Sequence, residues 1–163
     1  MTRIYLGLGA NLGDPQATLR DAVSALKQHP ELRNLRCSSF YGSKPMGPTD
    51  QPDYVNAAVA ADTLLTPAAL LQLAHRIEQQ FGRQRQRRWG ERTLDIDILL
   101  YGDDTIAEAQ LQIPHLGLCQ RDFVLVPLLE LEPTLCLPDG RALTQIWQQL
   151  QAAAAGHDLV KIS

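Results

Sequence analysis

The sequence predicts one α+β domain, in which two helices pack on a mainly antiparallel sheet. Three observations support this prediction. The length of 163 residues is that of a single domain. The hydrophobic content of 45% and the charged content of 20% are typical of a globular chain with a real core. The apolar residues change between strand and helix periods in the order β-α-β-β-α-β. We therefore expect one domain over residues 1–163, with a C-terminal extension.

The first strand and the first helix are predicted at the start of the chain. Residues 4–9 form a short apolar run, and Asp14 with Pro15 has the residue types of a helix N-terminus. The segment between them carries three glycines, Gly7, Gly9 and Gly13. Their spacing is not that of a dinucleotide-binding motif, and a tight strand-to-helix turn accounts for them.

The second and third strands are expected at residues 35–41 and 54–62. Residues 42–53 lie between them and are rich in Pro and Gly, and a loop of this length is usually functional. The core is expected to take the Val55 side of the third strand. Tyr54 and Asn56 then lie on the opposite side, where an aromatic ring beside an amide suits a flat heterocycle, although this pair alone favours a plain sheet tyrosine with a polar neighbour.

The second helix is predicted to start at Thr66-Pro67, to stop at Gly82 and to bury Leu70, Leu73, Ala74, Ile77 and Phe81. In the strand that follows, Leu94, Ile96, Ile98 and Leu100 are predicted on one face, and Asp95, Asp97, Leu99 and Tyr101 on the other. Later elements are a short extended piece at 111–113, a helix at 123–131 that includes Pro127, and a last helix at 144–155. This order is that of a ferredoxin-like sandwich with both helices on one face, which leaves the other face free for Asp95, Asp97, Tyr54 and Asn56.

Asp95 and Asp97 are the main chemical signal. Side chains two apart on a strand lie roughly 7 Å from each other, so the two carboxylates can share a cation or bridge two. Mg²⁺ is the expected ion because it prefers oxygen ligands, usually one or two carboxylates together with substrate phosphates. Five arginines, Arg83, Arg85, Arg87, Arg88 and Arg92, come just before the pair. Arginines bind phosphates, so the two features together indicate a nucleotide polyphosphate site.

Other interpretations of these features remain open. The Asp-x-Asp pattern alone is also that of the solvated face of an amphipathic strand. The arginine cluster could form an RNA-binding surface on a ferredoxin-like module, although strand carboxylates would repel a phosphate backbone. The net charge of −3 gives no general attraction to nucleic acid.

Composition also bears on the cellular setting. The three cysteines, Cys37, Cys119 and Cys136, have no metal-finger spacing and are expected to be reduced thiols in a cytoplasmic protein. The apolar run near the N-terminus lacks the features of a signal peptide. No stretch approaches the ~18–20 apolar residues that span a bilayer.

Residues 88–99, Arg-Trp-Gly-Glu-Arg-Thr-Leu-Asp-Ile-Asp-Ile-Leu, resemble the signature of the 6-hydroxymethyl-7,8-dihydropterin pyrophosphokinase family. Further segments resemble the family in the same order, up to about Leu150: residues 7–13, 38–41, 47–48, 50–58, 76–78, 114–115 and 138–140. The resemblance implies transfer of a pyrophosphoryl group from ATP to the hydroxymethyl oxygen of a reduced pterin, with release of AMP, in folate biosynthesis. It also implies two Mg²⁺ ions, a monomer, and neither nucleic acid nor membrane as partner.

The resemblance further implies the roles of individual residues. Asp95 and Asp97 hold the metal ions and, with Arg83 and Arg92, form the catalytic set. The residues implied to bind the pterin are Ser43, Lys44, Met46, Tyr54, Asn56, Trp89 and Phe123. The residues implied to bind or border the nucleotide are Glu78, Arg83, Arg92, Ile98, His115 and Arg121. Arg83, Trp89 and Arg92 are implied to lie on a loop that closes over the substrates.

The chain departs from the family pattern at a few positions. Gln110, Gln112 and Leu116 stand where the pattern has Arg, Thr and Tyr, and His75 stands where a Gln is expected. The arginine loop is one residue shorter. None of these changes touches the aspartate pair, so we expect an active enzyme with altered ATP affinity. A paralogue that binds the ligands but has lost transfer is the alternative.

Overall fold

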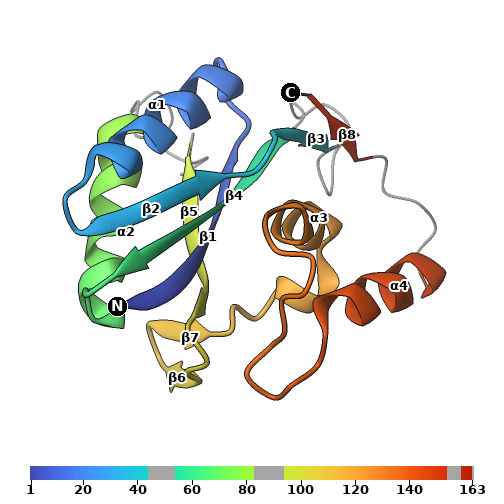
Figure 1. Ribbon diagram of the computed structural model, residues 1–163. Coiled ribbons are helices and arrows are strands. Elements are labelled where there is room, and N and C mark those ends of the chain that lie inside the picture. Colours follow the sequence, from blue (N-terminus) through green and yellow to red (C-terminus); the bar gives the residue numbers. More distant parts are fainter. Residues whose placement is uncertain (44–53, 83–93, 154–158, 163) are drawn as a thin grey trace.

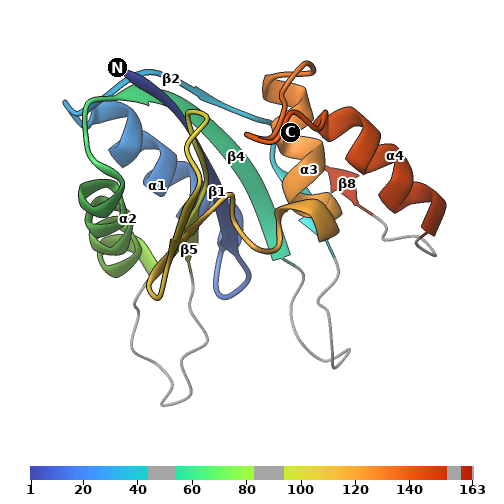
Figure 2. The ribbon, with the colours of Figure 1, turned by 90° about the horizontal axis from the view of Figure 1, so that it is seen from below.

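The computed structural model describes residues 1–43, 54–82, 94–153 and 159–162, and these residues form three layers. A central antiparallel sheet has α1 (Pro15–Gln28) and α2 (Pro67–Gly82) on one face. The other face is covered in part by α3 (Asp122–Leu131) and α4 (Leu143–Ala153). Figures 1 and 2 show the two helix pairs on opposite sides of the sheet. In the described part of the chain, every helix is too short or too polar to cross a lipid bilayer.

The main sheet has the order β5-β1-β4-β3-β8, and β2 also pairs with β4, next to β3. All of its pairings are antiparallel. Its strands are β1 (Thr2–Ala10), β2 (Leu32–Cys37), β3 (Tyr41–Ser43), β4 (Tyr54–Thr63), β5 (Asp95–Tyr101) and β8 (Val160–Lys161). A separate hairpin of β6 (Ile106–Glu108) and β7 (Leu111–Ile113) and a 3₁₀ turn, η1 (Leu118–Gln120), connect β5 to α3.

The local signals for the first two helices are confirmed. The carboxylate of Asp14 accepts the backbone N–H of Ala17 at 3.2 Å, and Pro15 occupies the first helical position of α1. The side-chain hydroxyl of Thr66 likewise accepts the N–H of Ala69 at 3.2 Å at the start of α2. These caps satisfy N–H groups that have no partner inside the helix.

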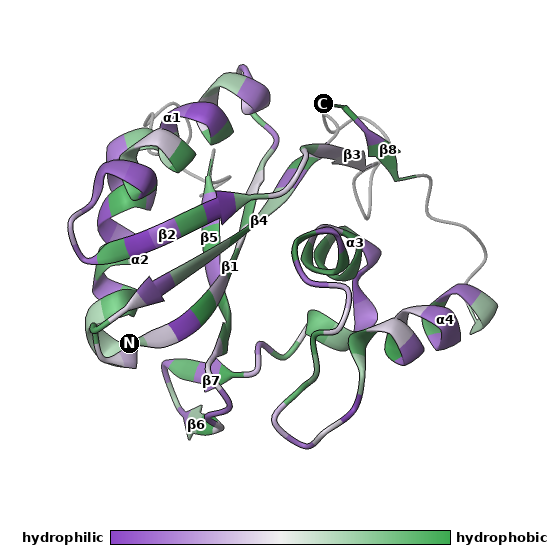
Figure 3. Cartoon of the chain, viewed as in Figure 1, coloured by the Kyte–Doolittle hydropathy of each residue, from purple (hydrophilic) through white to green (hydrophobic). Residues whose placement is uncertain are grey.

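Two hydrophobic cores lie on the two faces of the sheet. The first contains Val55, Ala57, Val59 and Ala61 of β4 together with the buried stripes of α1 and α2. The predicted assignment of the Val55 side of this strand to the core is therefore confirmed. The second core contains Ala58 and Ala60 of the same strand and buried residues of η1, α3 and α4, namely Leu118, Leu125, Leu128, Leu143 and Ile146. α3 is hydrophobic around much of its circumference, as Figure 3 shows.

Three expectations about the elements are corrected. The open face of the sheet is not bare, because the segment after β5 folds back over part of it as α3 and α4. The single strand expected at residues 35–41 is two strands, β2 and β3. Between them, the Ser38 N–H still donates to the Ala58 carbonyl at 2.8 Å, but the Ser38 Oγ, in place of a backbone carbonyl, accepts the N–H of Ala58 at 2.9 Å. The strand β8 was not expected, and it adds to β3 at the sheet edge.

The alternation predicted for β5 is wrong at its C-terminal end. The register of β5 on β1 shifts between Tyr5 and Leu6, so Leu99 is an extra residue at a β-bulge. Leu100 therefore joins Leu99 in the second core, and Tyr101 turns into the first. The Tyr101 hydroxyl donates to the carbonyl of Leu65 at 2.6 Å, which fixes it on the α2 side.

Glu130 joins α3 to the segment between β2 and β3. Its carboxylate accepts the N–H of Ser39 at 2.8 Å, the Ser39 hydroxyl at 3.1 Å and the Tyr41 hydroxyl. Burial alone would raise the pKa of Glu130, but these hydrogen bonds outweigh it and lower the pKa. Burial and the bond to Glu130 raise the pKa of Tyr41 to about 12. The folded protein therefore favours a charged Glu130 beside a neutral Tyr41.

We expect Glu130→Gln to reduce the free energy of unfolding at pH 7 by about 1 kcal/mol, because Glu130 is partly exposed and solvent screens its bonds. A lowered carboxyl pKa stabilises the fold above the unfolded value of about 4.3 and loses that effect as pH falls through the folded pKa. The difference between variant and wild type should therefore be full at neutral pH, shrink as the pH falls below about 4.3 and vanish only below the folded pKa of Glu130. Urea unfolding between pH 3 and 8 measures it. Glu108→Gln, at an exposed position of β6, is the control, and a pH-independent difference would contradict the assignment.

Candidate active site

Three strands place polar groups and glycines in rows on the face of the sheet that α3 and α4 partly cover. Gly9 of β1 pairs with Asp95 of β5 on one side and with Asn56 of β4 on the other. Gly7 likewise pairs with Asp97 and with Ala58. Directly paired residues point to the same face, so the two carboxylates and the amide lie on one surface, separated by residues without side chains.

The two glycines form the floor of this surface. A Cβ atom at Gly9 would lie 2.8 Å from Oδ1 of Asn56, and one at Gly7 would lie 3.3 Å from both methyl carbons of Leu99. The expectation that a strand-to-helix turn accounts for all three glycines is therefore wrong for Gly7 and Gly9, which lie inside β1. It holds for Gly13, which has a φ of +65° and follows the strand.

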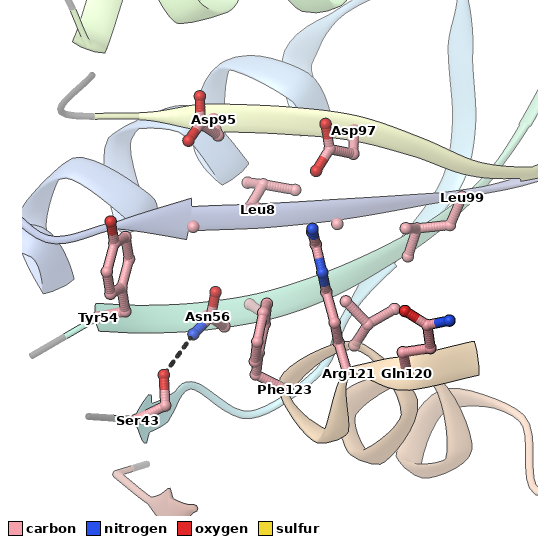
Figure 4. A pocket seen from close by; sticks show the side chains of 14 residues that line it. Leu8, Ser43, Tyr54, Asn56, Asp95, Asp97, Leu99, Gln120, Arg121 and Phe123 are labelled. Carbon is pink, nitrogen blue, oxygen red and sulfur yellow. Dashed lines mark hydrogen bonds between the residues drawn. The ribbon is translucent and has the colours of Figure 1, made fainter. Parts of the chain in front are cut away.

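An open pocket of about 420 Å³ lies over this floor, within the size range of small-molecule sites. The sheet supplies one wall and α3 with the turn before it supplies the other, as Figure 4 shows. The lining residues are Gly7, Leu8, Gly9, Ser43, Tyr54, Asn56, Ala57, Asp95, Asp97, Leu99, Gln120, Arg121, Phe123 and Val124.

The Asn56 amide is held in one orientation at the β4 end of the pocket. Its Nδ2 donates to Oγ of Ser43 at 3.1 Å, and both side chains are only 6% exposed. The amide oxygen is turned over Gly9 and faces the pocket (Figure 4). Asn56 therefore presents an acceptor to a ligand edge that carries an N–H or amino group.

The two aspartates lie along the opposite edge of the pocket on β5 (Figure 4). The Asp97 side chain is 47% exposed, and its Oδ2 lies 3.7 Å from Nε2 of His115. No cluster of three or more His, Cys, Asp or Glu side chains occurs among the residues that the structure describes. Two carboxylates with open positions beside them fit Mg²⁺, which completes its octahedron with water and phosphate oxygens.

Arg121 and Phe123 close the pocket from the α3 side. Phe123 is in the first turn of α3, and Arg121 is the residue just before that helix. The guanidinium of Arg121 lies over the Phe123 ring, 5.8 Å from its centroid, which is a cation–π distance. Buried Leu118 and Leu125 anchor the chain on either side of these two residues.

The structure brings together seven of the residues that the sequence singled out: Ser43, Tyr54, Asn56, Asp95, Asp97, Arg121 and Phe123. His115 lies at the edge, next to Asp97. Glu78 is outside the pocket lining, and its carboxylate accepts the N–H of Ile96 at 2.8 Å at the start of β5. The Ile98 side chain is 4% exposed in the first core, on the other face of the sheet, so it cannot line this pocket. Lys44, Met46, Arg83, Trp89 and Arg92 lie outside the described residues.

Sequence reasoning missed Gly7, Gly9 and Gln120 as lining residues. The i, i+2 spacing of the glycines inside an apolar strand was the available signal, because it places both on one face. Gln120 has no such signal, since it lies in the short turn η1, in which only Leu118 is buried.

The fold and the pocket define an α+β protein with a small-molecule site on an antiparallel sheet, where an amide and aromatic rings face a pair of carboxylates. Residues 5–133 match the family described as 7,8-dihydro-6-hydroxymethylpterin-pyrophosphokinase (HPPK). The chain belongs to the HPPK family.

Relatives and a solved structure agree with this assignment. The chain is 45% identical over 163 residues to a Haemophilus influenzae protein named 2-amino-4-hydroxy-6-hydroxymethyldihydropteridine pyrophosphokinase, covering 100% of this chain and 99% of that protein. A Pseudomonas aeruginosa protein of the same name is 45% identical over 144 residues, covering 88% and 89% of the two chains. A crystal structure of wild-type Plasmodium falciparum HPPK-DHPS with SDX-DHP shares the fold, with a TM-score of 0.69 at 15% identity. That likeness covers 91% of this chain and 43% of the longer Plasmodium chain.

Proposed function

We propose that the chain is the enzyme that transfers a pyrophosphoryl group from ATP to the hydroxymethyl oxygen of 6-hydroxymethyl-7,8-dihydropterin, giving the pterin diphosphate and AMP in folate biosynthesis. The observation that carries this proposal is a pocket with two chemically different ends. One end has a fixed amide and two aromatic rings, and the other has two carboxylates and a guanidinium. A flat heterocycle matches the first of these ends, and a polyphosphate with its bound cations matches the second.

The aromatic end is suited to the pterin. Tyr54 and Phe123 come from the sheet and from α3, on either side of the pocket, so a planar ring can lie between them (Figure 4). The Asn56 oxygen accepts a hydrogen bond from the N–H edge of that ring, and Ser43 keeps the amide in place. We extend the pterin set to Lys44, Met46 and Trp89, which lie outside the described residues.

The charged end is suited to the phosphates. Asp95 and Asp97 hold Mg²⁺, proposed as two ions, which when bound neutralise the phosphate charge that would otherwise repel these carboxylates. Arg121 binds a phosphate oxygen from the α3 side, and His115 donates from Nε2 beside Asp97. Glu78, Ile98, Arg83 and Arg92 complete the proposed nucleotide set. The Ile98 side chain is buried on the other face of the sheet, so only its backbone is proposed for this set.

Catalysis then rests on positioning and electrostatics. The pterin held at one end places its hydroxymethyl group toward the carboxylate edge, where the phosphates are bound, so the attack becomes unimolecular. Positive charge around the transferred group stabilises the charge that develops in the transition state. We assign no side chain of this pocket as a general base.

We also propose the finer architecture and setting. The strand order β5-β1-β4, with β2 and β3 next to β4, supports a ferredoxin-like core to which α3, α4 and β8 are added. Residues 1–163 act as one pyrophosphokinase domain and as a monomer in the cytoplasm, without nucleic acid or membrane as partner. The three free cysteines, Cys37, Cys119 and Cys136, support a reducing compartment.

AMP release tests the proposal. With Mg-ATP, wild-type protein should release AMP only when 6-hydroxymethyl-7,8-dihydropterin is present, and Asp95→Ala should release none above background. ADP in place of AMP would mean a different kinase chemistry. Absence of nucleotide turnover by folded wild-type protein would favour a paralogue that only binds the ligands, and a thermal shift with Mg-ATP would then detect the binding.

A further inference from the structure

Gly117 lies in the turn between His115 and Arg121, and its backbone does not require a glycine. Its φ is −89° and its ψ is 0°, which other residues adopt without strain. A glycine at this position therefore needs an explanation other than backbone conformation.

The Arg121 guanidinium occupies the space that a side chain at position 117 would fill. A Cβ atom built on Gly117 lies 2.6 Å from Nε of Arg121, 2.7 Å from its Cζ and 3.1 Å from its Cδ. Real Cβ atoms essentially never approach other atoms within 3.0 Å. Any other residue at 117 must therefore displace the guanidinium from its place over the Phe123 ring.

The displaced group is the far end of a flexible side chain. Arg121 is exposed at its place before α3, so the guanidinium can move into solvent without disturbing the core. The cost to folding should therefore be small. In the wild-type protein the positive charge of Arg121 faces the pocket between Phe123 and the carboxylates (Figure 4). A side chain at position 117 would turn this charge away.

The same glycine also fixes the ring of His115. The N–H of Gly117 donates to Nδ1 of His115 at 3.1 Å, so Nδ1 has no proton in this arrangement. The neutral ring then carries its proton on Nε2, the nitrogen that lies 3.7 Å from Oδ2 of Asp97. Gly117 thus orients both the Arg121 guanidinium and the His115 ring on this side of the pocket.

We propose that Gly117 is a positioning residue, which leaves room for the Arg121 guanidinium to lie over Phe123 and directs the His115 Nε2–H toward Asp97. The expected effect on turnover rests on the proposed function. The effect on geometry does not.

Gly117→Ala is the direct test, because it adds only the Cβ and keeps the N–H that binds His115. We expect its thermal midpoint to stay within about 2 °C of wild type, since alanine fits this backbone. We expect kcat/KM for ATP to fall about tenfold, mainly through KM, because a charge-assisted phosphate contact is weakened. An unchanged kcat/KM for ATP would overturn the proposal.

A double-mutant cycle separates this effect from a general disturbance of the turn. If Gly117 acts through Arg121, adding Gly117→Ala to Arg121→Ala should change kcat/KM by less than about twofold. An equal tenfold loss in both backgrounds would overturn the proposed route.

NMR tests the geometry without any turnover. The Nε–H resonance of Arg121, identified by its loss in Arg121→Ala, should shift in Gly117→Ala because the group leaves the Phe123 ring current. The ¹⁵N shifts of His115 should report a proton on Nε2 in both proteins, since an alanine at position 117 retains the backbone N–H. An unmoved Arg121 resonance, or a His115 proton on Nδ1, would overturn the proposal even if the wild type released AMP. A wild type that makes no AMP but shows both signatures would refute only the proposed function.

Discussion

Asp97→Asn should abolish catalysis while sparing the pterin end of the pocket. We expect kcat for pterin-dependent AMP formation to fall by at least about 10³-fold, because removing one of two carboxylates weakens the hold on the charge-neutralising metal. Pterin affinity should change by less than about threefold, since Asn56 lies two strands and Ser43 three strands away from Asp97. Steady-state kinetics and calorimetric pterin binding measure the two effects.

The matched control is Asp103→Asn, which makes the same chemical change at an exposed turn just after β5. This variant should keep wild-type kcat and wild-type pterin affinity. Partial recovery of Asp97→Asn at higher Mg²⁺ concentration would support loss of metal affinity as the cause. Equal losses of kcat and pterin binding in Asp97→Asn would contradict the division of the pocket into two ends.

Leu125→Ala should have the largest effect on stability. Leu125 is 0% exposed and belongs to the second core, where α3 packs on the sheet. Truncating a fully buried leucine removes apolar contacts and leaves a cavity, so we expect the free energy of unfolding to fall by about 2–5 kcal/mol. Urea unfolding at pH 7 measures the change.

Leu64→Ala is the comparison for this variant, because the same atoms are removed from a side chain that is 72% exposed. It should change the free energy of unfolding by less than about 0.5 kcal/mol. A loss below about 1 kcal/mol in Leu125→Ala would mean that α3 does not depend on the second core for its position. Phe123 and Arg121 would then need another anchor.

Much of the fold could be predicted because local rules and packing agree. The Asp14 cap, the buried stripe of α2 and the Val55 face of β4 each follow from a period or a capping residue, and the structure confirms them. The family resemblance noted at residues 88–99 is likewise confirmed by the HPPK match over residues 5–133. The clustering of Asp95, Asp97, Tyr54 and Asn56 on one face follows from strand alternation together with the predicted order, in which both helices cover the opposite face.

What could not be predicted depends on tertiary contacts that have no local signature. The bulge at Leu99 reverses the faces of Leu100 and Tyr101, and a single extra residue leaves no mark in an apolar run. The packing of α3 over the sheet decides that Phe123 faces the pocket, and only the resemblance indicated this residue beforehand. The strand β8 consists of Val160 and Lys161, too few residues for any periodicity.

The row formed by Asp95, Gly9 and Asn56 ties ligand binding to the order in which the chain folds. Its three members come from segments far apart in the sequence, and each pairing is non-local, so the closure of long loops must precede the site. A partly folded chain with only its helices or a single hairpin has the right residues but no binding surface. Ligands therefore recognise only the completed sheet, and binding should slow amide hydrogen exchange throughout β1, β4 and β5 rather than at the pocket alone.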